Sequence, residues 1–187
     1  MKESATVPSP EDTVIRSATT DDALCLAVLG MQVFLDTYAT EGVRPQVARE
    51  VLSLFSVESF VEVLSQANTH VVVAERKAHL VGFAQITLDV AQRLVPRGRQ
   101  GELFRLYVQE PFTRQGLGTR LLQAAEHAAA ARGTSVLWLT PWVHNRRALA
   151  FYAARGYADF GETWYRFEGE EHKNRVLAKH LGPTNAA

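Results

Sequence analysis

Apolar and polar positions alternate along this chain with two periods, one typical of strands and one typical of amphipathic helices. In the first half they predict a strand at 13–17, a helix over 23–34, a broken helical unit at 46–55 and 57–66, and strands at 70–75 and 80–88. Thr19 or Thr20 suits the N-cap of the first helix, and residues 76–79 suit a turn between the two strands. The stretch at 36–45 is expected to be a loop.

Strands and helices alternate more regularly in the second half. The pattern predicts a strand at 101–108, a helix at 117–131, a strand at 135–139, a helix at 145–155, closing strands at 157–160 and 164–168, and a last short strand with a loose tail within 174–187. Residues 89–100 form a polar, arginine-rich loop, and Gly133 ends the long helix. The order β-α-α-β-β-β-α-β-α-β-β predicts an α/β (mixed α+β) fold.

The composition is that of an ordinary folded domain. The 187 residues are enough for one domain with a full core, expected at 13–181 between a disordered N-terminal tail at 1–12 and a C-terminal tail at 182–187. Twenty Lys and Arg balance twenty Asp and Glu, so no net field favours nucleic acid or a membrane surface. With no apolar run of about 18 residues and no apolar leader, a cytoplasmic protein is expected. Cys25, the single cysteine, lies in an apolar helical stretch and is expected in the core.

The most specific chemical signal follows the predicted strand at 101–108. Arg114-Gln115-Gly116-Leu117-Gly118-Thr119 leads directly into the helix at 117–131. A strand, a glycine-rich turn and a helix N-terminus make an anion site, because the first N–H groups lack intrahelical partners and the helix dipole favours negative charge. The spacing matches neither a P-loop nor the dinucleotide fingerprint, whose third glycine would replace Leu121. The loop predicts a different phosphorylated ligand, with a plain helix-initiating turn as the alternative.

A second motif lies downstream, in the sequence NRRALAFYAARGY at 145–157. Asn145 stands at an N-cap, and Ala148, Phe151 and Tyr152 share one helical face. This segment resembles motif B of the GNAT family of N-acetyltransferases, N-x-x-A-x-x-F-Y-x-x-x-G-F/Y. The loop at 113–118 resembles motif A of the same family, Q/R-x-x-G-x-G/A, with Thr113 as a departure. The resemblance covers roughly residues 14–181.

The resemblance implies a fold and a subfamily. The GNAT fold is a central mixed, mostly antiparallel sheet of six to seven strands, flanked by helices, with a V-shaped split between the fourth and fifth strands. The segments WLTPWVHN at 138–145 and GETWYRF at 161–167 look like the PaiA-type polyamine acetyltransferases, with departures at Thr140, Pro141 and Val143.

The resemblance also implies a site for acetyl-CoA as co-substrate, with no metal. Backbone N–H groups of the glycine loop would hold the pyrophosphate, with charge from Arg114 or Arg120. The open edge of the strand at 101–108 would pair with the pantetheine arm and direct an N–H at the thioester oxygen. Asn145 would hydrogen-bond the pantetheine. The expected cofactor-binding residues are Leu106, Tyr107, Val108, Arg114, Gln115, Gly116, Leu117, Gly118, Thr119, Arg120, Asn145 and Tyr152.

Two residues are expected to move protons. An alkyl amine is mostly protonated near neutral pH, so a base must remove its proton. Glu102 resembles the base glutamate of the family's histone-modifying branch, with His144 and Glu110 as weaker rivals. Tyr152 matches the family's general acid, and a buried aromatic anchor is the alternative for it.

The sequence leaves the acceptor open. The leading hypothesis is acetyl transfer to a primary amine of a small molecule, a polyamine among the options, by direct attack in a ternary complex. A protein or peptide acceptor and a non-catalytic acyl-CoA-binding module remain as alternatives. Side chains that would line or attract the acceptor are Phe34, Tyr38, Phe55, Phe60, Asp36, Glu41, Glu58 and Glu62, and Arg93, Arg97 and Arg99 are candidates for the 3′-phosphate. Homodimerisation is left open, with the segment 164–167 as either a core strand or a subunit contact.

Overall fold

A single sheet forms the centre of the molecule in this computed structural model, which describes residues 12–167 and 170–182. Seven strands lie in this described part: β1 Thr13–Ser17, β2 Thr69–Arg76, β3 His79–Leu88, β4 Gln100–Val108, β5 Val136–Leu139, β6 Ala158–Phe167 and β7 Glu170–His180. Their order is β1-β2-β3-β4-β5-β7-β6. Every neighbouring pair is antiparallel except β4 and β5, which are parallel, so the mixed and mostly antiparallel sheet is confirmed.

The sheet splits at its parallel pair. Only Gln100–Glu102 of β4 are in register with Val136–Trp138 of β5, and β4 then continues to Val108 away from its neighbour. β5 stops at Leu139, two residues before Pro141, which has no N–H to donate to a ladder. The expected V-shaped split between the fourth and fifth strands is therefore confirmed, and it leaves backbone groups of β4 open.

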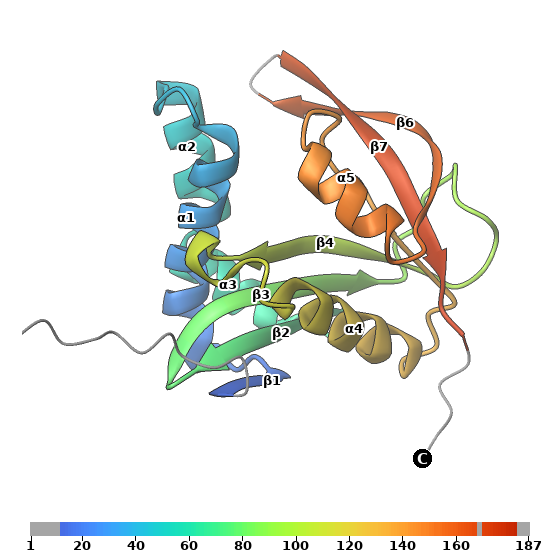
Figure 1. Cartoon of the computed structure of the whole chain (residues 1–187), viewed down its shortest axis with the longest axis horizontal. Coiled ribbons are helices and arrows are strands. Elements are labelled where there is room, and N and C mark those ends of the chain that lie inside the picture. Colours follow the sequence, from blue (N-terminus) through green and yellow to red (C-terminus); the bar gives the residue numbers. More distant parts are fainter. Residues whose placement is uncertain (1–11, 168–169, 183–187) are drawn as a thin grey trace, which may run out of the picture.

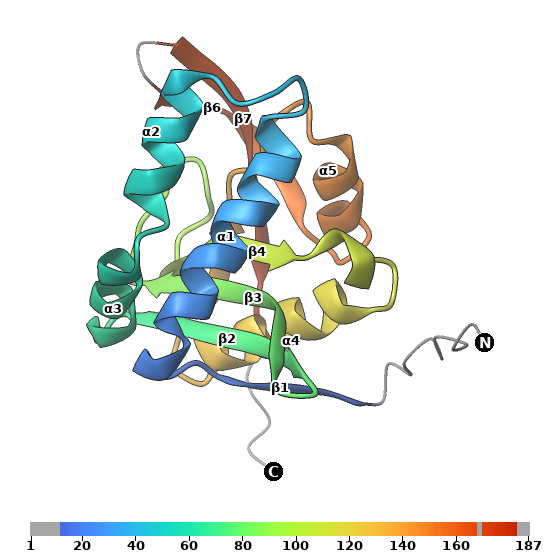
Figure 2. The same cartoon turned by 90° about the vertical axis from the view of Figure 1, so that its left-hand side faces the viewer.

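Helices cover both faces of the sheet (Figure 1). On one face lie α1 Ala23–Tyr38, α2 Pro45–Leu54 and α3 Val57–Ser65, and on the other lie α4 Leu117–Ala130 and α5 Arg146–Ala153. The predicted broken unit is two separate helices, because the Ser56 hydroxyl accepts a hydrogen bond from Ser59 N (3.0 Å) and so starts α3 anew. In the view of Figure 2, α1 lies in front of the sheet with α3 beside it.

Two apolar layers hold these helices on the sheet. Leu121, Leu122 and Ala125 of α4 pack on one face, and Phe55, Phe60 and Phe83 pack on the other. Burying a side chain such as leucine or phenylalanine contributes about 1.5–3 kcal/mol, so each layer is a substantial stabilising term. Among the described residues, no helix is both long and apolar enough to cross a bilayer.

The closing strands differ from the prediction. Residues 157–160 and 164–168 were predicted as two closing strands, but Ala158–Phe167 is one continuous strand, and the expected end at Glu168 lies outside the described residues. A bulge between Asp159 and Gly161 (φ +131°) interrupts the register of this strand, and the N–H of Gly161 donates to Asp159 Oδ1 (3.0 Å). The partner of β6 is β7, which has 11 residues and is far longer than the expected last short strand.

The prediction for Cys25 was wrong. Its side chain is exposed on α1, because Ala23, Leu26 and Ala27 form the helix face that meets the sheet. The tails expected at 1–12 and 182–187 lie outside the described residues except for Asp12 and Gly182.

Candidate active site

Two cavities meet at the split in the sheet. The loop cavity, of about 470 Å³, is lined by the glycine loop, α5 and the C-terminal part of α1. The aromatic cavity, of about 500 Å³, lies along β4 and is lined by rings from α1, α2, β4 and β6. Leu106, Asn145, Ala148 and Tyr152 line both cavities, so a ligand in one cavity can touch a ligand in the other. Figure 1 shows α1 and α2 on one side of this region and α5 with β6 and β7 on the other, above β4.

The glycine loop leaves the N-terminus of α4 bare. Gly116 is the N-cap of α4 in the left-handed region (φ +82°), which favours glycine, and Arg114 is also left-handed (φ +59°). A Cβ on Gly118 would lie 3.3 Å from the ring of Phe151, so a side chain there would press on α5. The first intrahelical bond in this turn runs from Arg120 N to Gly116 O (3.1 Å), which leaves the N–H groups before Arg120 without intrahelical acceptors. These residues fit a phosphate group approaching the helix end.

Arg155 supplies positive charge at this helix end. Its Nε donates to Thr119 Oγ1 (3.1 Å), and its guanidinium stacks 3.7 Å above the ring of Phe151. Both Arg155 and Arg114 line the loop cavity. The guanidinium of Arg120, by contrast, donates to Thr13 O of β1 (2.7 Å). The sequence analysis missed Arg155, although its i, i+4 spacing from Phe151 in the second motif was a usable signal.

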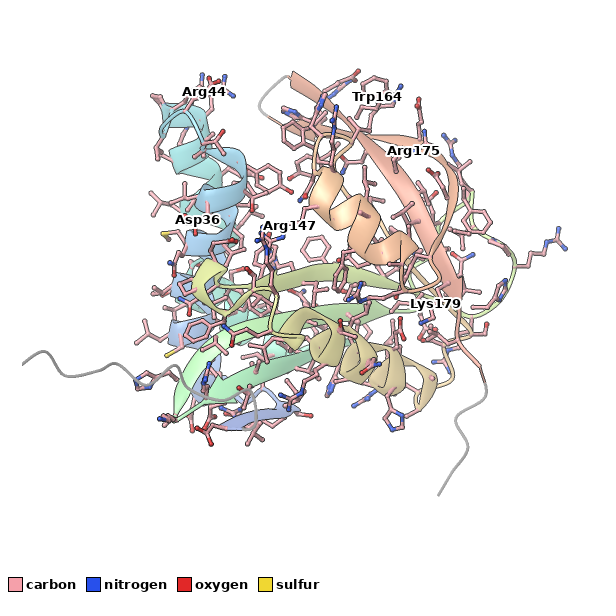
Figure 3. All side chains as sticks on the ribbon, viewed as in Figure 1. Asp36, Arg44, Arg147, Trp164, Arg175 and Lys179 are labelled. Carbon is pink, nitrogen blue, oxygen red and sulfur yellow. The ribbon has the colours of Figure 1, made fainter. Side chains whose placement is uncertain are left out.

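Other arginines lie at the rim or at the opposite end of β4. Arg147 lines the loop cavity together with Asp36 and pairs with Glu110 (2.9 Å), and Figure 3 shows Arg147 between α1 and α5. The loop with Arg93, Arg97 and Arg99 precedes β4, whereas the glycine loop follows it, so the structure does not bring these three arginines to the loop cavity. Arg99 instead pairs with Asp89 (2.8 Å).

Tyr152 sits at the junction of the two cavities. Its side chain is buried, with the rings of Phe151 and Tyr157 edge-on at 5.2 and 5.5 Å. Burial raises the pKa of its phenol well above the usual 10, so the hydroxyl keeps its proton throughout the physiological range. Asn145 caps α5 by accepting from Ala148 N (3.0 Å), which is the predicted N-cap role.

Glu102 lines the aromatic cavity and has a strongly shifted carboxyl group. Burial raises its pKa from 4.5 to about 7, because a charged carboxylate is poorly solvated there. The two rival bases are placed less favourably. Arg147 holds the pKa of the exposed Glu110 below its usual range, and His144 is exposed against Trp142.

A bulge in β4 decides which side chains share a face with Glu102. Gln85 of β3 faces Arg105, and the next residue, Ile86, faces Leu103, so Phe104 is an extra residue in β4. In a regular strand, residues three apart point to opposite faces, and the extra residue places Glu102 and Arg105 on the same one. Both side chains line the aromatic cavity.

Contacts between distant elements bridge the aromatic cavity. The hydroxyl of Tyr165 of β6 donates a hydrogen bond to Glu50 Oε1 of α2 (2.9 Å), and the ring centroids of Tyr38 and Trp142 lie 5.8 Å apart. Phe34, Tyr38 and Phe55 line this cavity, and Phe60 supports Phe55 from behind. The expected acidic side chains are elsewhere, since Asp36 lines the loop cavity, and neither cavity is lined by Glu41, Glu58 or Glu62. No cluster of three metal-ligating side chains occurs within residues 12–167 and 170–182.

A split sheet with a bare helix end beside one cavity and a second cavity adjoining it is the arrangement expected of an acyl-CoA-dependent N-acetyltransferase. Residues 36–157 match the model of the acetyltransferase (GNAT) family, and the chain belongs to this family. It is therefore an enzyme of the acyltransferase type, and GNAT enzymes use acetyl-CoA.

Individual relatives agree with this assignment. The chain is 30% identical over 154 residues to an IAA acetyltransferase of Azospirillum brasilense, covering 81% of this chain and 88% of that protein. It is 25% identical over 155 residues to an uncharacterized N-acetyltransferase of Lactobacillus delbrueckii subsp. lactis, covering 82% and 88%. The crystal structure of the PaiA N-acetyltransferase of Thermoplasma acidophilum in complex with coenzyme A superimposes with a TM-score of 0.70 over 90% of this chain and 98% of that one. At 19% identity this likeness shows the fold.

Proposed function

We propose that this protein transfers an acetyl group from acetyl-CoA to a primary amine of a small molecule by direct attack in a ternary complex. The observation that carries the proposal is the meeting of the loop cavity and the aromatic cavity at Tyr152 and Leu106. Two ligands that meet there need no covalent enzyme intermediate, because holding both in place already makes the reaction effectively unimolecular.

The loop cavity is the proposed donor site. The N–H groups of Leu117, Gly118 and Thr119 would hold the pyrophosphate, with Arg155 and Arg114 as counter-charges. The open edge of β4 at Leu106 and Val108 would accept the pantetheine amides, since strand edges demand partners. Acetyl-CoA supplies the electrophilic acetyl carbon at the end of this arm.

One proposed proton carrier, Tyr152, lies at the junction, and the other, Glu102, lies in the aromatic cavity. Glu102, with a pKa of about 7, is a base matched to neutral pH and would accept a proton from the acceptor ammonium, directly or through water, so that the neutral amine can attack the acetyl carbon. Tyr152 Oη would donate a hydrogen bond to the leaving sulfur. Its pKa is raised above that of a thiol, so it stabilises the thiolate better than it could protonate it fully.

The contacts that bridge the aromatic cavity favour a small acceptor. Tyr165–Glu50 and Tyr38–Trp142 cross the cavity, whereas a peptide acceptor would need an open groove. Among the described residues, one carboxylate, that of Glu102, lines this cavity, which is poor in the negative charge that a polyamine would require.

Release of free thiol from acetyl-CoA in the presence of a panel of amines and lysine-containing peptides tests the proposal. We expect thiol release that depends on a small amine, together with the acetylated amine by mass spectrometry. Binding of acetyl-CoA without thiol release from any acceptor would contradict it and favour a non-catalytic binding module.

A further inference from the structure

Arg105 is a buried cation inside the aromatic cavity. Only 7% of its surface is exposed. Its guanidinium carbon lies 5.0 Å from the ring centroid of Phe55, 5.6 Å from that of Phe60 and 4.7 Å from that of Phe104. Its Nη1 donates to Gln85 Oε1 (2.6 Å), which is a neutral acceptor.

The charge of Arg105 is not matched by an acid. The hydroxyls that act on it electrostatically belong to Tyr107 and Tyr165, which are neutral at physiological pH, and no carboxylate of the described residues forms an ion pair with it. Burial therefore lowers the pKa of this guanidinium. A buried charge without a counter-charge is unfavourable unless a ligand supplies the opposite charge.

A carboxylate is the chemical group that suits this arrangement. A guanidinium has five N–H donors in a planar fork that matches a carboxylate in a bidentate geometry. A polycationic acceptor would be repelled by this guanidinium.

The bulge at Phe104 fixes how an acceptor would lie. It places Glu102 and Arg105 on one face of β4, three residues apart, which separates their Cα atoms by up to about 10 Å. An acceptor with an amine at one end and a carboxylate at the other can reach both residues at once. The amine would lie toward Glu102.

We infer that the acceptor is an amine that also carries a carboxylate, of the amino-acid class, held through its carboxylate by Arg105 in the aromatic cavity. This inference rests on the proposed acetyltransferase function and adds the substrate class to it.

Matched acceptors that differ only at the carboxylate test the inference. One set is L-lysine with L-lysinamide and 1,5-diaminopentane, which lack the carboxylate. The second set is 4-aminobutyrate with butylamine. We expect the acid of each set to show a kcat/KM about 10- to 100-fold above its neutral or cationic partner, the range of a charge-assisted hydrogen bond. Arg105→Met should reduce the ratio of kcat/KM between the acid and its partner to about 1, and Arg105→Lys should keep part of this preference.

A second variant and a folding check show whether a loss of preference comes from Arg105 itself, from a change in net charge or from misfolding. Arg97→Met removes one positive charge from an exposed loop residue that lines neither cavity and should leave the preference unchanged. If Arg105→Met does not fold, a thermal-unfolding check will show it, and the wild-type preference together with Arg105→Lys then decides.

Equal or better turnover of the diamine by the wild type would overturn the inference and leave the acetyltransferase function intact. Calorimetric titration of the CoA-bound protein with L-lysine and 1,5-diaminopentane separates the two claims further. Arg105-dependent binding of the amino acid without turnover would support the inference and contradict the proposed function. Absence of both binding and turnover with every acid would contradict the inference.

Discussion

At the residue scale, the carboxyl group of Glu102 links burial to pH dependence. Its pKa of about 7 means that the fraction of enzyme with an ionised base rises between about pH 6 and 8. With an amine whose own pKa lies below 6, kcat/KM should therefore rise through an apparent pKa near 7. Glu102→Gln should lower kcat/KM by about 100-fold or more and remove this rise. An unchanged pH profile in Glu102→Gln would assign the base to another group.

The same pKa shift predicts that replacing Glu102 with glutamine stabilises the folded protein above pH 7. The folded-state pKa of Glu102 lies above the unfolded value of about 4.5, so the folded protein binds the extra proton between these values and loses stability as pH rises through about 7. Glu102→Gln removes this loss and should raise the free energy of unfolding at pH 8, relative to wild type, by about 1–3 kcal/mol. Urea unfolding at pH 4 and pH 8 measures it. A variant that is equally destabilised at both pH values would contradict the shift.

Tyr152 and its neighbour Tyr157 form a matched pair of buried phenols. Tyr152 lines both cavities, whereas the hydroxyl of Tyr157 donates a hydrogen bond to Glu126 Oε1 of α4 (3.1 Å). Tyr152→Phe should lower kcat about 100-fold with the affinity for acetyl-CoA changed less than about 3-fold. Tyr157→Phe should lower stability by about 1 kcal/mol and leave kcat near wild type. Steady-state kinetics and a CoA titration measure both, and equal losses of kcat and affinity in Tyr152→Phe would remove the acid role.

The site residues were predictable from the sequence where a motif specifies them. They were not predictable where a contact between distant parts of the chain decides which side chain reaches the site. Tyr152 and Asn145 follow from the spacing of the second motif, and the structure places both at the junction of the cavities. The side chain of Arg120 is drawn to Thr13 O, 107 residues away in the sequence, and Arg155 lies at the helix end in its place. Contacts of that sequence separation leave no local pattern to read.

At the element scale, alanine variants of two glycines distinguish the effect of backbone strain from the effect on ligand binding. Gly116 (φ +82°) and Gly42 (φ +112°) are both left-handed, and a Cβ at either would meet no atom within 4 Å. Alanine at either position should therefore lower stability by about 1–2 kcal/mol through strain alone. Only the methyl of Gly116→Ala enters the loop cavity, so it should weaken CoA binding about 10-fold while Gly42→Ala does not. Equal affinities in the two variants would place the phosphates elsewhere.

A bulge also explains where the prediction of elements was wrong. The hydrophobic pattern predicted two closing strands, at 157–160 and 164–168. The structure has one long strand with a bulge between Asp159 and Gly161, and β7 pairs with this strand on both sides of the bulge. The bulge at Phe104 carries no glycine at all and left no signal in the alternation of β4. The element order was predictable from periodicity, whereas register irregularities depend on cross-strand partners.

At the scale of the whole molecule, the hydrogen bond between Tyr165 of β6 and Glu50 of α2 bridges the aromatic cavity, and we propose that it limits the size of the acceptor. Tyr165 and Trp164 are adjacent on β6, but Tyr165 lines the aromatic cavity and Trp164 does not. Trp164 is exposed, and Figure 3 labels it. Wild type should acetylate a small amine at least about 10-fold more efficiently than a lysine-containing peptide. Tyr165→Ala removes the contact with Glu50 and should lower the ratio of efficiency with the small amine to that with the peptide, whereas Trp164→Ala should leave this ratio unchanged. A wild type that prefers the peptide would contradict the proposed limit on acceptor size.

The central claim is that the two cavities hold donor and acceptor on either side of Tyr152. A crystal structure of the protein with coenzyme A bound tests it most directly. The account predicts the pyrophosphate at the N–H groups of Leu117 to Thr119, the pantetheine along the open edge of β4, and the sulfur within hydrogen-bond reach of Tyr152 Oη at the entrance to the aromatic cavity. Coenzyme A bound away from the glycine loop, or with its sulfur remote from Tyr152, would contradict it.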